Sequence, residues 1–204
     1  IGMSQIVPVI IGLARKGWSI AVITCEKNKI NPELHDLLEE NNVHWKVLNF
    51  GRVGAIGGLG RILRLVISLP KGSMYHCRGD LAATVCVIRN KKLFLWDVRG
   101  LWIDQKIVIG TIVNNAILIK LARQLESISA RKAKAVSTLT YAVYPILKGR
   151  HPKLTGFHKV IPTCTDLDKF EFEDKFPEQK TLLLSGVFNE YYDLNVTSKF
   201  ISEL

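Results

Sequence analysis

Short apolar runs alternate with amphipathic segments along most of the chain. Runs rich in β-branched residues with little internal alternation are typical of strands that are buried on both faces. Six such strands are predicted, at Ser19–Thr24, Val43–Leu48, Ser73–Cys77, Leu93–Asp97, Ala135–Thr138 and Lys159–Pro162. Apolar residues three or four apart predict helices between them. The predicted helical stretches are Met3–Lys16, Pro32–Asn41, Arg61–Leu69, Asp80–Arg89, Ile107–Ala133 (as one or two helices) and Thr140–Lys148.

This alternation of strands and helices indicates the fold class. It is typical of a parallel sheet with helices on both faces, which predicts a doubly wound, mostly parallel α/β domain of the Rossmann-like kind over residues 1–169. Such a domain normally opens with a strand, whereas the first predicted element here is a helix. We therefore expect that the first strand of the domain is not part of this sequence.

The C-terminal quarter has a different composition. Residues 170–180, FEFEDKFPEQK, are charged and contain a proline, as linkers often do. A strand at Thr181–Gly186 and a helix at Asp193–Leu204 follow. One strand and one helix cannot enclose a core, so residues 181–204 are predicted to begin a second α/β domain that the sequence does not complete.

Composition supports a folded protein and draws attention to charge. Of the 204 residues, 48% are hydrophobic and 23% are charged, which argues against a disordered chain. The net charge is +10, divided as +6 over residues 1–105, +8 over residues 106–153 and −4 over residues 154–204. A basic body favours an anionic partner, either a phosphorylated ligand, a membrane surface or nucleic acid. A solvated basic surface is the alternative, and composition alone favours it.

Cysteine usage and hydropathy bear on location. Cys25, Cys77, Cys86 and Cys164 are widely spaced and form no C-x-x-C pair, which argues against a zinc knuckle or a disulfide scaffold and favours a reducing cytosol. The most apolar window, Ile107–Ile119, is shorter than the roughly 20 residues that a spanning helix needs. No signal peptide is visible at the start of the sequence. We expect a cytoplasmic protein.

Candidate chemistry lies where the predicted strands end, because ligands of parallel α/β sheets bind beyond the carboxyl ends of the strands. Two arginines there suit phosphate or carboxylate, and glycine amides allow an anion to approach closely. The candidates are His76, Arg78, Asp97, Arg99, Gly100, Thr138, Thr163 and Asp166, together with Gly57 and Gly58 of a glycine-rich loop at Gly51–Gly60.

Each candidate also has an ordinary structural explanation. The glycine-rich segment matches neither the Walker A pattern nor G-x-G-x-x-G, so a flexible turn explains it equally well. His76 could be a core histidine, and Asp97 could form a structural ion pair with Arg99. The sequence contains no G-x-S-x-G, no H-E-x-x-H and no cluster with metal-ligand spacing, so no metal is predicted. Local residue chemistry alone leaves the function open.

Several short segments, taken in order, carry a family resemblance. They are LARKG at 13–17, IAVIT at 20–24, YHCR at 75–78, LWDVRG at 95–100, LE at 125–126 with RKA at 131–133 and VST at 136–138, VIPTCTD at 160–166 with Phe170, and LSG at 184–186. Their order resembles the N-terminal domain of family-4 glycosyltransferases, retaining enzymes with two facing Rossmann-like domains. The sequence departs from the family where Thr163, Cys164 and Thr165 replace Asn-Gly-Val and where Lys134 replaces an acidic residue. The glutamate pair of the family's donor domain has no counterpart here.

The resemblance implies a reaction and roles for the candidates. A sugar would pass from a nucleotide-sugar to a glycan or lipid-linked acceptor with retention, in surface polysaccharide synthesis, without a metal or other cofactor. His76 and Arg78 would be catalytic, near the transferred sugar. The other candidates named above would line the acceptor side of the cleft, and Ser185 and Gly186 would begin the donor-binding half. The isolated fragment is expected to be inactive.

The resemblance also implies partners. The basic residues 106–153 and Arg61–Arg64 would face an anionic membrane, which places the protein at the inner face of the membrane as a peripheral contact. No nucleic acid partner is expected. Two other functions stay open: a nicotinamide- or flavin-dependent oxidoreductase, which needs a glycine fingerprint after the first strand, and a non-catalytic basic module that binds nucleic acid or membrane.

Overall fold

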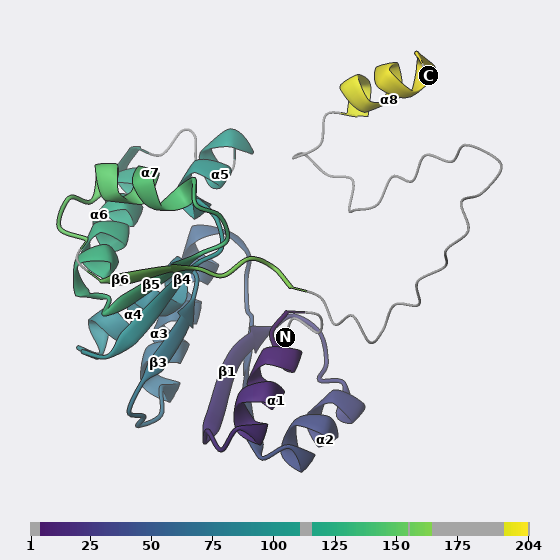
Figure 1. Ribbon diagram of the computed structural model, residues 1–204, viewed down its shortest axis with the longest axis vertical. Coiled ribbons are helices and arrows are strands. Elements are labelled where there is room, and N and C mark those ends of the chain that lie inside the picture. Colours follow the sequence, from purple (N-terminus) through teal and green to yellow (C-terminus); the bar gives the residue numbers. More distant parts are fainter. Residues whose placement is uncertain (1–4, 111–115, 155, 165–193, 204) are drawn as a thin grey trace.

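The computed structural model describes residues 5–110, 116–154, 156–164 and 194–203. Six strands and eight helices alternate in this part of the chain (Figure 1), which confirms the predicted α/β class. The strands are β1 (Ile20–Glu26), β2 (Val43–Asn49), β3 (Tyr75–Arg78), β4 (Phe94–Val98), β5 (Ala135–Thr138) and β6 (Phe157–Val160). The helices are α1 (Val7–Arg15), α2 (Pro32–Glu40), α3 (Gly54–Ser68), α4 (Asp80–Ile88), α5 (Trp102–Val108), α6 (Ala116–Lys132), α7 (Val143–Arg150) and α8 (Leu194–Ser202).

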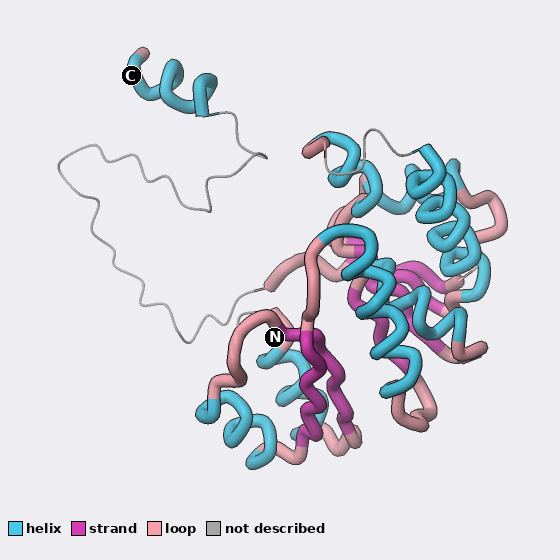
Figure 2. Tube along the Cα trace, turned by 180° about the vertical axis from the view of Figure 1, so that it is seen from behind, coloured by secondary structure: helices cyan, strands magenta, loops and turns pink. Residues whose placement is uncertain are grey.

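Every strand pairing is parallel, as predicted, but the strands form two sheets. One sheet contains β1 and β2, and the other has the order β3-β4-β5-β6. Helices α1 and α2 pack against the two-stranded sheet, and α4 packs against β3 and β4. Figure 2 shows α3 and α4 on the face opposite to α1 and α2. The domain therefore has helices on both faces, as a Rossmann-like fold requires.

Local sequence signals explain most of the element boundaries. Asn31 caps α2 through its side-chain oxygen, which accepts a hydrogen bond from the backbone N–H of Glu33 at 3.0 Å, and Pro32 occupies the first helical position. Pro8 lies in the first turn of α1, where its missing N–H removes no helical hydrogen bond. Helix α2 begins where capping and proline chemistry predict, whereas α1 begins at Val7, inside the predicted range Met3–Lys16, and has no side-chain cap.

The glycine-rich segment differs from the prediction. The expected loop at Gly51–Gly60 is mostly helical, because α3 begins at Gly54. A Cβ atom on Gly57 would lie 1.6 Å from the carbonyl oxygen of Arg52, so glycine permits a close approach between the helix and the segment before it. The glycines of this segment therefore serve helix packing at Gly57, where a loop was expected.

Two separate clusters of buried side chains form the core. The larger surrounds Phe94 and Trp96 of β4 and is closed by helices α4, α6 and α7. The smaller joins α1 and α2 to β2 around Leu38 and Val43. Burial on both faces holds for β4 and β5, whereas all seven residues of β1 remain half-buried or exposed.

The C-terminal predictions are covered only in part. Helix α8 overlaps the helix expected at Asp193–Leu204. The expected linker at 170–180 and the strand at Thr181–Gly186 lie outside the described residues. Within the described part of the chain, no helix is both long enough and apolar enough to cross a bilayer.

Candidate functional site

The register of the four-stranded sheet gathers polar side chains at its carboxyl edge. Arg78 of β3 lies opposite Asp97 of β4, and Asp97 lies opposite Ser137 of β5. Directly opposed residues of adjacent strands point to the same face of a sheet, so these three side chains are neighbours. His76 lies two residues before Arg78 and therefore shares its face. We call His76, Arg78, Asp97 and Arg99 the rim cluster.

Asp97 is the buried centre of the rim cluster, with a side chain that is 8% exposed. The hydroxyl of Ser137 donates a hydrogen bond to Asp97 Oδ1 at 2.8 Å. Asp97 Oδ2 lies 3.6 Å from His76 Nε2 and 3.9 Å from a guanidinium nitrogen of each of Arg78 and Arg99. Burial opposes ionisation of this carboxyl, but the interactions with His76 and Ser137 outweigh it and lower its pKa. Asp97 therefore carries a negative charge at neutral pH.

The cationic side chains around Asp97 are more accessible than the carboxylate. The side chains of Arg99, Arg78 and His76 are 23%, 37% and 51% exposed. Two arginines against one carboxylate leave a net positive charge of one. Partial burial lowers the pKa of Arg78, and the like charge of Arg99 acts in the same direction, while Asp97 opposes both. An anion bound between them would relieve this repulsion.

Both arginines donate hydrogen bonds to one oxygen atom of Gln5. Its side-chain Oε1 accepts hydrogen bonds from Arg78 Nη2 at 2.5 Å and from Arg99 Nη2 at 3.0 Å. Arg99 also donates to the hydroxyl of Thr163 at 3.3 Å. An oxygen of a phosphate or carboxylate could accept the same two hydrogen bonds with greater strength, because it carries charge.

The start of α1 adds to this positive potential. Gln5 lies two residues before α1, so the hydrogen bonds to Gln5 bring the two arginines near the N-terminus of that helix. Every residue in the first turn of α1 is described, and none is acidic. No side chain of the described residues caps this turn. The partial positive charge of a helix N-terminus favours anions. The rim cluster and α1 together form a site suited to an oxyanion.

The structure brings some of the predicted site residues together and separates others. His76, Arg78, Asp97, Arg99 and Thr163 meet at the rim. Thr138 is fully buried, where its hydroxyl donates to the carbonyl of Thr140 at 3.0 Å and lies 2.9 Å from His158 Nε2.

The predicted glycines make no contact with the rim cluster among those described, and three further candidates lie outside the described residues. Gly57 and Gly58 belong to the first turns of α3, and Gly100 packs against the side chain of Gln105. Asp166, Ser185 and Gly186 lie outside the described residues.

Two members of the site are absent from the predicted site residues, Ser137 and Gln5. Ser137 lies with Thr138 at the end of the predicted strand, and alternation places only one of the two on the face of Asp97, but the sequence does not say which. Gln5 lies 73 positions from Arg78 and 94 from Arg99. No sequence signal connects residues so far apart.

A second polar network, also unpredicted, joins α5, α6 and α7. Buried Glu126 contacts His151 Nε2 at 2.6 Å and Arg123 at 3.1 Å. Asp104 accepts from Arg123 at 2.8 Å and from Arg150 at 2.7 Å. Burial opposes ionisation of Asp104, but these arginines lower its pKa to about 2. Part of the basic charge of residues 106–153 is therefore engaged within the protein.

Arg61 and Arg64 are also engaged within the protein. Arg61 donates to the carbonyl of Arg52 at 2.9 Å, and Arg64 donates to the carbonyl of Asn49 at 3.1 Å. Both guanidinium groups thus point back toward the end of β2. The remainder of α3 presents an exposed apolar stripe, whose members are Ile56, Leu59, Leu63 and Ile67.

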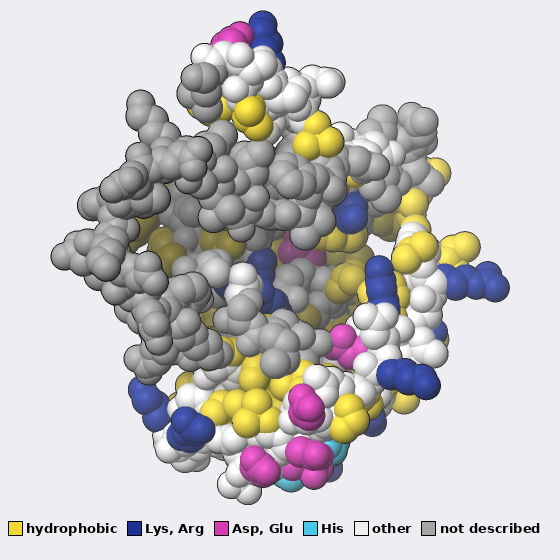
Figure 3. Space-filling model, turned by 90° about the vertical axis from the view of Figure 1, so that its right-hand side faces the viewer, with side chains coloured by type: hydrophobic (Ala, Val, Ile, Leu, Met, Phe, Trp, Pro, Cys, Tyr) yellow, Lys and Arg dark blue, Asp and Glu magenta, His cyan; other side chains and the backbone are white. Residues whose placement is uncertain are grey.

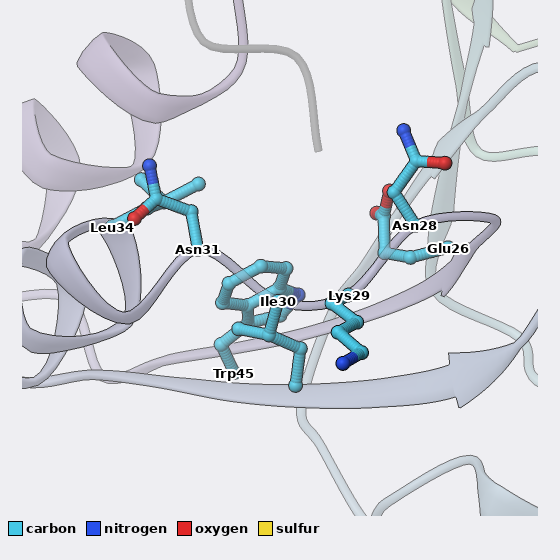
Figure 4. Close-up of a pocket in the computed structure, with 7 residues that line it drawn as sticks. All are labelled: Glu26, Asn28, Lys29, Ile30, Asn31, Leu34 and Trp45. Carbon is cyan, nitrogen blue, oxygen red and sulfur yellow. The ribbon is translucent and has the colours of Figure 1, made fainter.

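A cavity of about 220 Å³ opens near the start of α2 (Figure 4) and is separate from the rim cluster. Its lining residues are Glu26, Asn28, Lys29, Ile30, Asn31, Leu34 and Trp45. In Figure 4 the side chains of Asn28 and Lys29 point in different directions, so they do not converge on one ligand position. In the described ranges, no group of three or more His, Cys, Asp or Glu side chains is arranged to hold a metal ion.

Charge is distributed unevenly over the surface. Acidic side chains gather with a histidine at the bottom of the face in Figure 3, where α2 lies. The acidic residues of α2 are Glu33, Asp36, Glu39 and Glu40. An anionic ligand is therefore favoured at the rim cluster and disfavoured along α2.

Comparisons with protein-family models, with curated proteins and with solved structures found no match for this chain. The family resemblance therefore rests on the ordered segments quoted above, and function has to be argued from the site itself.

Proposed function

We propose that this chain is the acceptor-side half of a glycosyltransferase that moves a sugar from a nucleotide-sugar to a glycan or lipid-linked acceptor with retention. One observation carries the proposal: two arginines and a histidine converge on buried Asp97 at the carboxyl edge of the sheet and remain accessible to solvent. The ordered segments that resemble family-4 glycosyltransferases support it, and so does the Rossmann-like fold. Such a cationic site suits nucleotide-sugar chemistry, because a nucleoside diphosphate leaves during transfer.

Each member of the rim cluster has a role in this proposal. Arg78 and Arg99 bind the oxygens of a phosphate group, where they now share the oxygen of Gln5. Asp97, held by Ser137, positions both guanidinium groups. His76 has the most exposed side chain of the cluster. It forms a hydrogen bond with a hydroxyl group near the transferred sugar. Donor contacts are assigned to Ser185 and Gly186.

A lipid-linked acceptor would bring the protein to the cytoplasmic face of a membrane. The exposed apolar stripe of α3 supports a peripheral contact of this kind. Since Arg61 and Arg64 hydrogen-bond to backbone carbonyls, the contact would depend on apolar burial more than on these two arginines. Sedimentation with phosphatidylglycerol vesicles measures it, and Ile56→Ser with Leu63→Ser should reduce the bound fraction.

Ligand titration followed by NMR tests the anion site. Pyrophosphate and nucleotide-sugars such as UDP-glucose or GDP-mannose should shift the signals of His76, Arg78 and Arg99. Arg78→Gln or Arg99→Gln should weaken pyrophosphate binding about tenfold or more. Arg89→Gln is the matched control, because Arg89 is an exposed arginine at the end of α4, outside the rim cluster.

Turnover tests the reaction. In the protein expressed from its full reading frame, Arg78→Gln should lower kcat/KM for nucleotide-sugar turnover by about 10²-fold. The isolated chain should bind pyrophosphate without transferring sugar. Sugar transfer by the isolated chain would contradict the division of the site between two domains. The proposal would give way to an oxidoreductase if the protein bound a nicotinamide dinucleotide in preference to every nucleotide-sugar. It would give way to a basic binding module if the protein bound DNA in a salt-sensitive manner and had no affinity for nucleotide-sugars.

A further inference from the structure

Two cysteines form a buried pair between β3 and α4. Cys77 lies in β3 and Cys86 near the end of α4, and both belong to the larger core cluster. The two residues are only 3% and 2% exposed. Their Sγ atoms lie 3.3 Å apart, and the thiol of Cys77 donates a hydrogen bond to the sulfur of Cys86. Both are free thiols in this structure, so the pair is already assembled in its reduced form.

The packing of the core holds the two sulfurs together. His76 and Arg78 point to the face of the rim cluster, so Cys77 between them points to the opposite face of the sheet, against which α4 packs. In α4, Ala83 lies three residues before Cys86 on the same side of the helix and is fully buried. A side chain as small as that of alanine lets the helix approach the strand closely. The position of the two thiols therefore follows from the fold.

A disulfide would require only a small movement of this pair. The sulfurs of a disulfide are about 2.05 Å apart, so the two Sγ atoms would have to approach each other by about 1.3 Å. The other two cysteines lie outside the larger core cluster. Cys25 is a half-buried residue of β1, and Cys164 is exposed after β6. Cys77 and Cys86 are therefore the two cysteines that the fold prepares for a bond within the chain.

The two thiols differ in acidity. The hydrogen bond from Cys77 lowers the pKa of Cys86 against the effect of burial, and the positive charge of Lys91 acts in the same direction. The same hydrogen bond, together with burial, raises the pKa of Cys77. Lys91 is held beside the pair, because its backbone N–H donates to the carbonyl of Cys86 at 2.8 Å and its Nζ lies 5.0 Å from the centre of the Tyr75 ring. Cys86 therefore carries the larger fraction of thiolate, which is the reactive form.

We propose that Cys77 and Cys86 are a site of reversible oxidation, at which hydrogen peroxide converts the two thiols to a disulfide between β3 and α4. Burial selects the oxidant. Hydrogen peroxide is close to water in size, whereas a bulky disulfide such as oxidised glutathione cannot reach either sulfur in the folded protein. This inference does not depend on what the rim cluster binds.

The oxidation takes place in two steps. The thiolate of Cys86 attacks one peroxide oxygen, the O–O bond breaks and hydroxide leaves, which forms a sulfenic acid on Cys86. The sulfur of Cys77 then attacks the sulfur of Cys86, the S–O bond breaks and a second hydroxide leaves. The two hydroxides take up the two thiol protons. Two thiols and one peroxide thus give one disulfide and two waters, and a thiol reductant such as dithiothreitol reverses the change.

Mass spectrometry of a variant with two cysteines tests the site. Cys25→Ser with Cys164→Ser leaves only the buried pair. Hydrogen peroxide should lower the mass of this folded variant by two hydrogen atoms and produce one linked peptide that contains Cys77 and Cys86, and dithiothreitol should restore both thiols. Oxidised glutathione should form the link about tenfold or more slowly than an equal concentration of peroxide. Unfolding in urea should abolish this protection from oxidised glutathione.

Single substitutions in the same background test the order of the steps. Cys77→Ala should gain oxygen at Cys86 under peroxide, whereas Cys86→Ala should leave Cys77 unmodified over the same time. Oxidation of Cys77 in the second variant as fast as that of Cys86 in the first would refute the order.

Peptide mapping of the unsubstituted chain tests the pair without any change to the core. Exposed Cys164 is the internal control, because its oxidation shows that the peroxide has acted. The proposal would be overturned if Cys164 were oxidised while Cys77 and Cys86 both remained thiols. It would equally be overturned if either of them were linked to Cys25 or Cys164 instead, or if oxidised glutathione formed the link in the folded chain as fast as peroxide.

Discussion

Asp80 provides the sharpest test of the electrostatics of this fold. It lies in the first turn of α4, where its Oδ1 accepts a hydrogen bond from the indole N–H of buried Trp96 at 3.1 Å. Burial raises the pKa of Asp80 to about 6, and the nearby charge of Glu126 contributes in the same direction. The hydrogen bond from Trp96 and the charge of Arg123 oppose this shift without cancelling it.

The raised pKa makes the charge of Asp80 unfavourable to folding. The shift from the ordinary 3.8 to about 6 corresponds to on the order of 3 kcal/mol. Because the pKa is higher in the folded protein, protonation favours folding. This contribution is fully present below about pH 4 and is lost as the pH rises through about 6. Asp80→Asn retains an oxygen that can accept from Trp96 and removes the charge.

Urea unfolding between pH 4 and pH 8, followed by tryptophan fluorescence, measures the effect. Asp80→Asn should be more stable than the wild type by about 2–3 kcal/mol at pH 8, with the difference shrinking toward zero near pH 4. Asp36→Asn, on the exposed side of α2, is the matched control and should change stability by less than about 0.5 kcal/mol. A difference for Asp80→Asn that is the same at both pH values, or a less stable variant at pH 8, would refute the reasoning.

Two further predictions concern packing. Gly57→Ala should destabilise the protein by about 2–3 kcal/mol, because the new methyl group would overlap the carbonyl of Arg52, whereas Gly58→Ala meets only an ordinary contact and should stabilise α3 by about 0.5–1 kcal/mol. Urea unfolding of the two variants measures both changes in stability, and equal changes would contradict the close approach of Gly57 to Arg52. Ser129→Ala should raise stability by about 1 kcal/mol, because the hydroxyl of Ser129 is buried without a hydrogen-bond partner in the described structure. Thermal unfolding measures this, and a lower Tm would show that the hydroxyl has a partner in solution.

The predictable part of the site follows from strand alternation. Residues 76 and 78 share a face because they are two positions apart in β3, and Asp97 and Arg99 are related in the same way. Because the carboxyl ends of neighbouring parallel strands meet at one edge of the sheet, the two pairs lie close together. Alternation also explains why the prediction of Thr138 as a site residue is wrong. Its neighbour Ser137 faces Asp97, so Thr138 must face the opposite side of the sheet.

Other features depend on contacts between distant segments. The helical start of α3 within a glycine-rich segment depends on the approach of Gly57 to Arg52 and on the bonds of Arg61 and Arg64 to carbonyl groups. Intrinsic glycine preference disfavours a helix there, so tertiary packing overrides it. The partners of Glu126 are likewise set by how α6 meets α7, which periodicity cannot specify.

By itself, the sequence determined what is local: six strands, the helices between them, the capped start of α2 and the parallel α/β class. These follow from hydrophobic periodicity, capping and chain direction, which act over a few residues. Only the tertiary structure decided that Gln5 joins Arg78 and Arg99 and that Asp97 is buried beneath the arginines and the histidine around it. Register, burial and long-range hydrogen bonds arise when distant segments meet, and no short window of sequence records them.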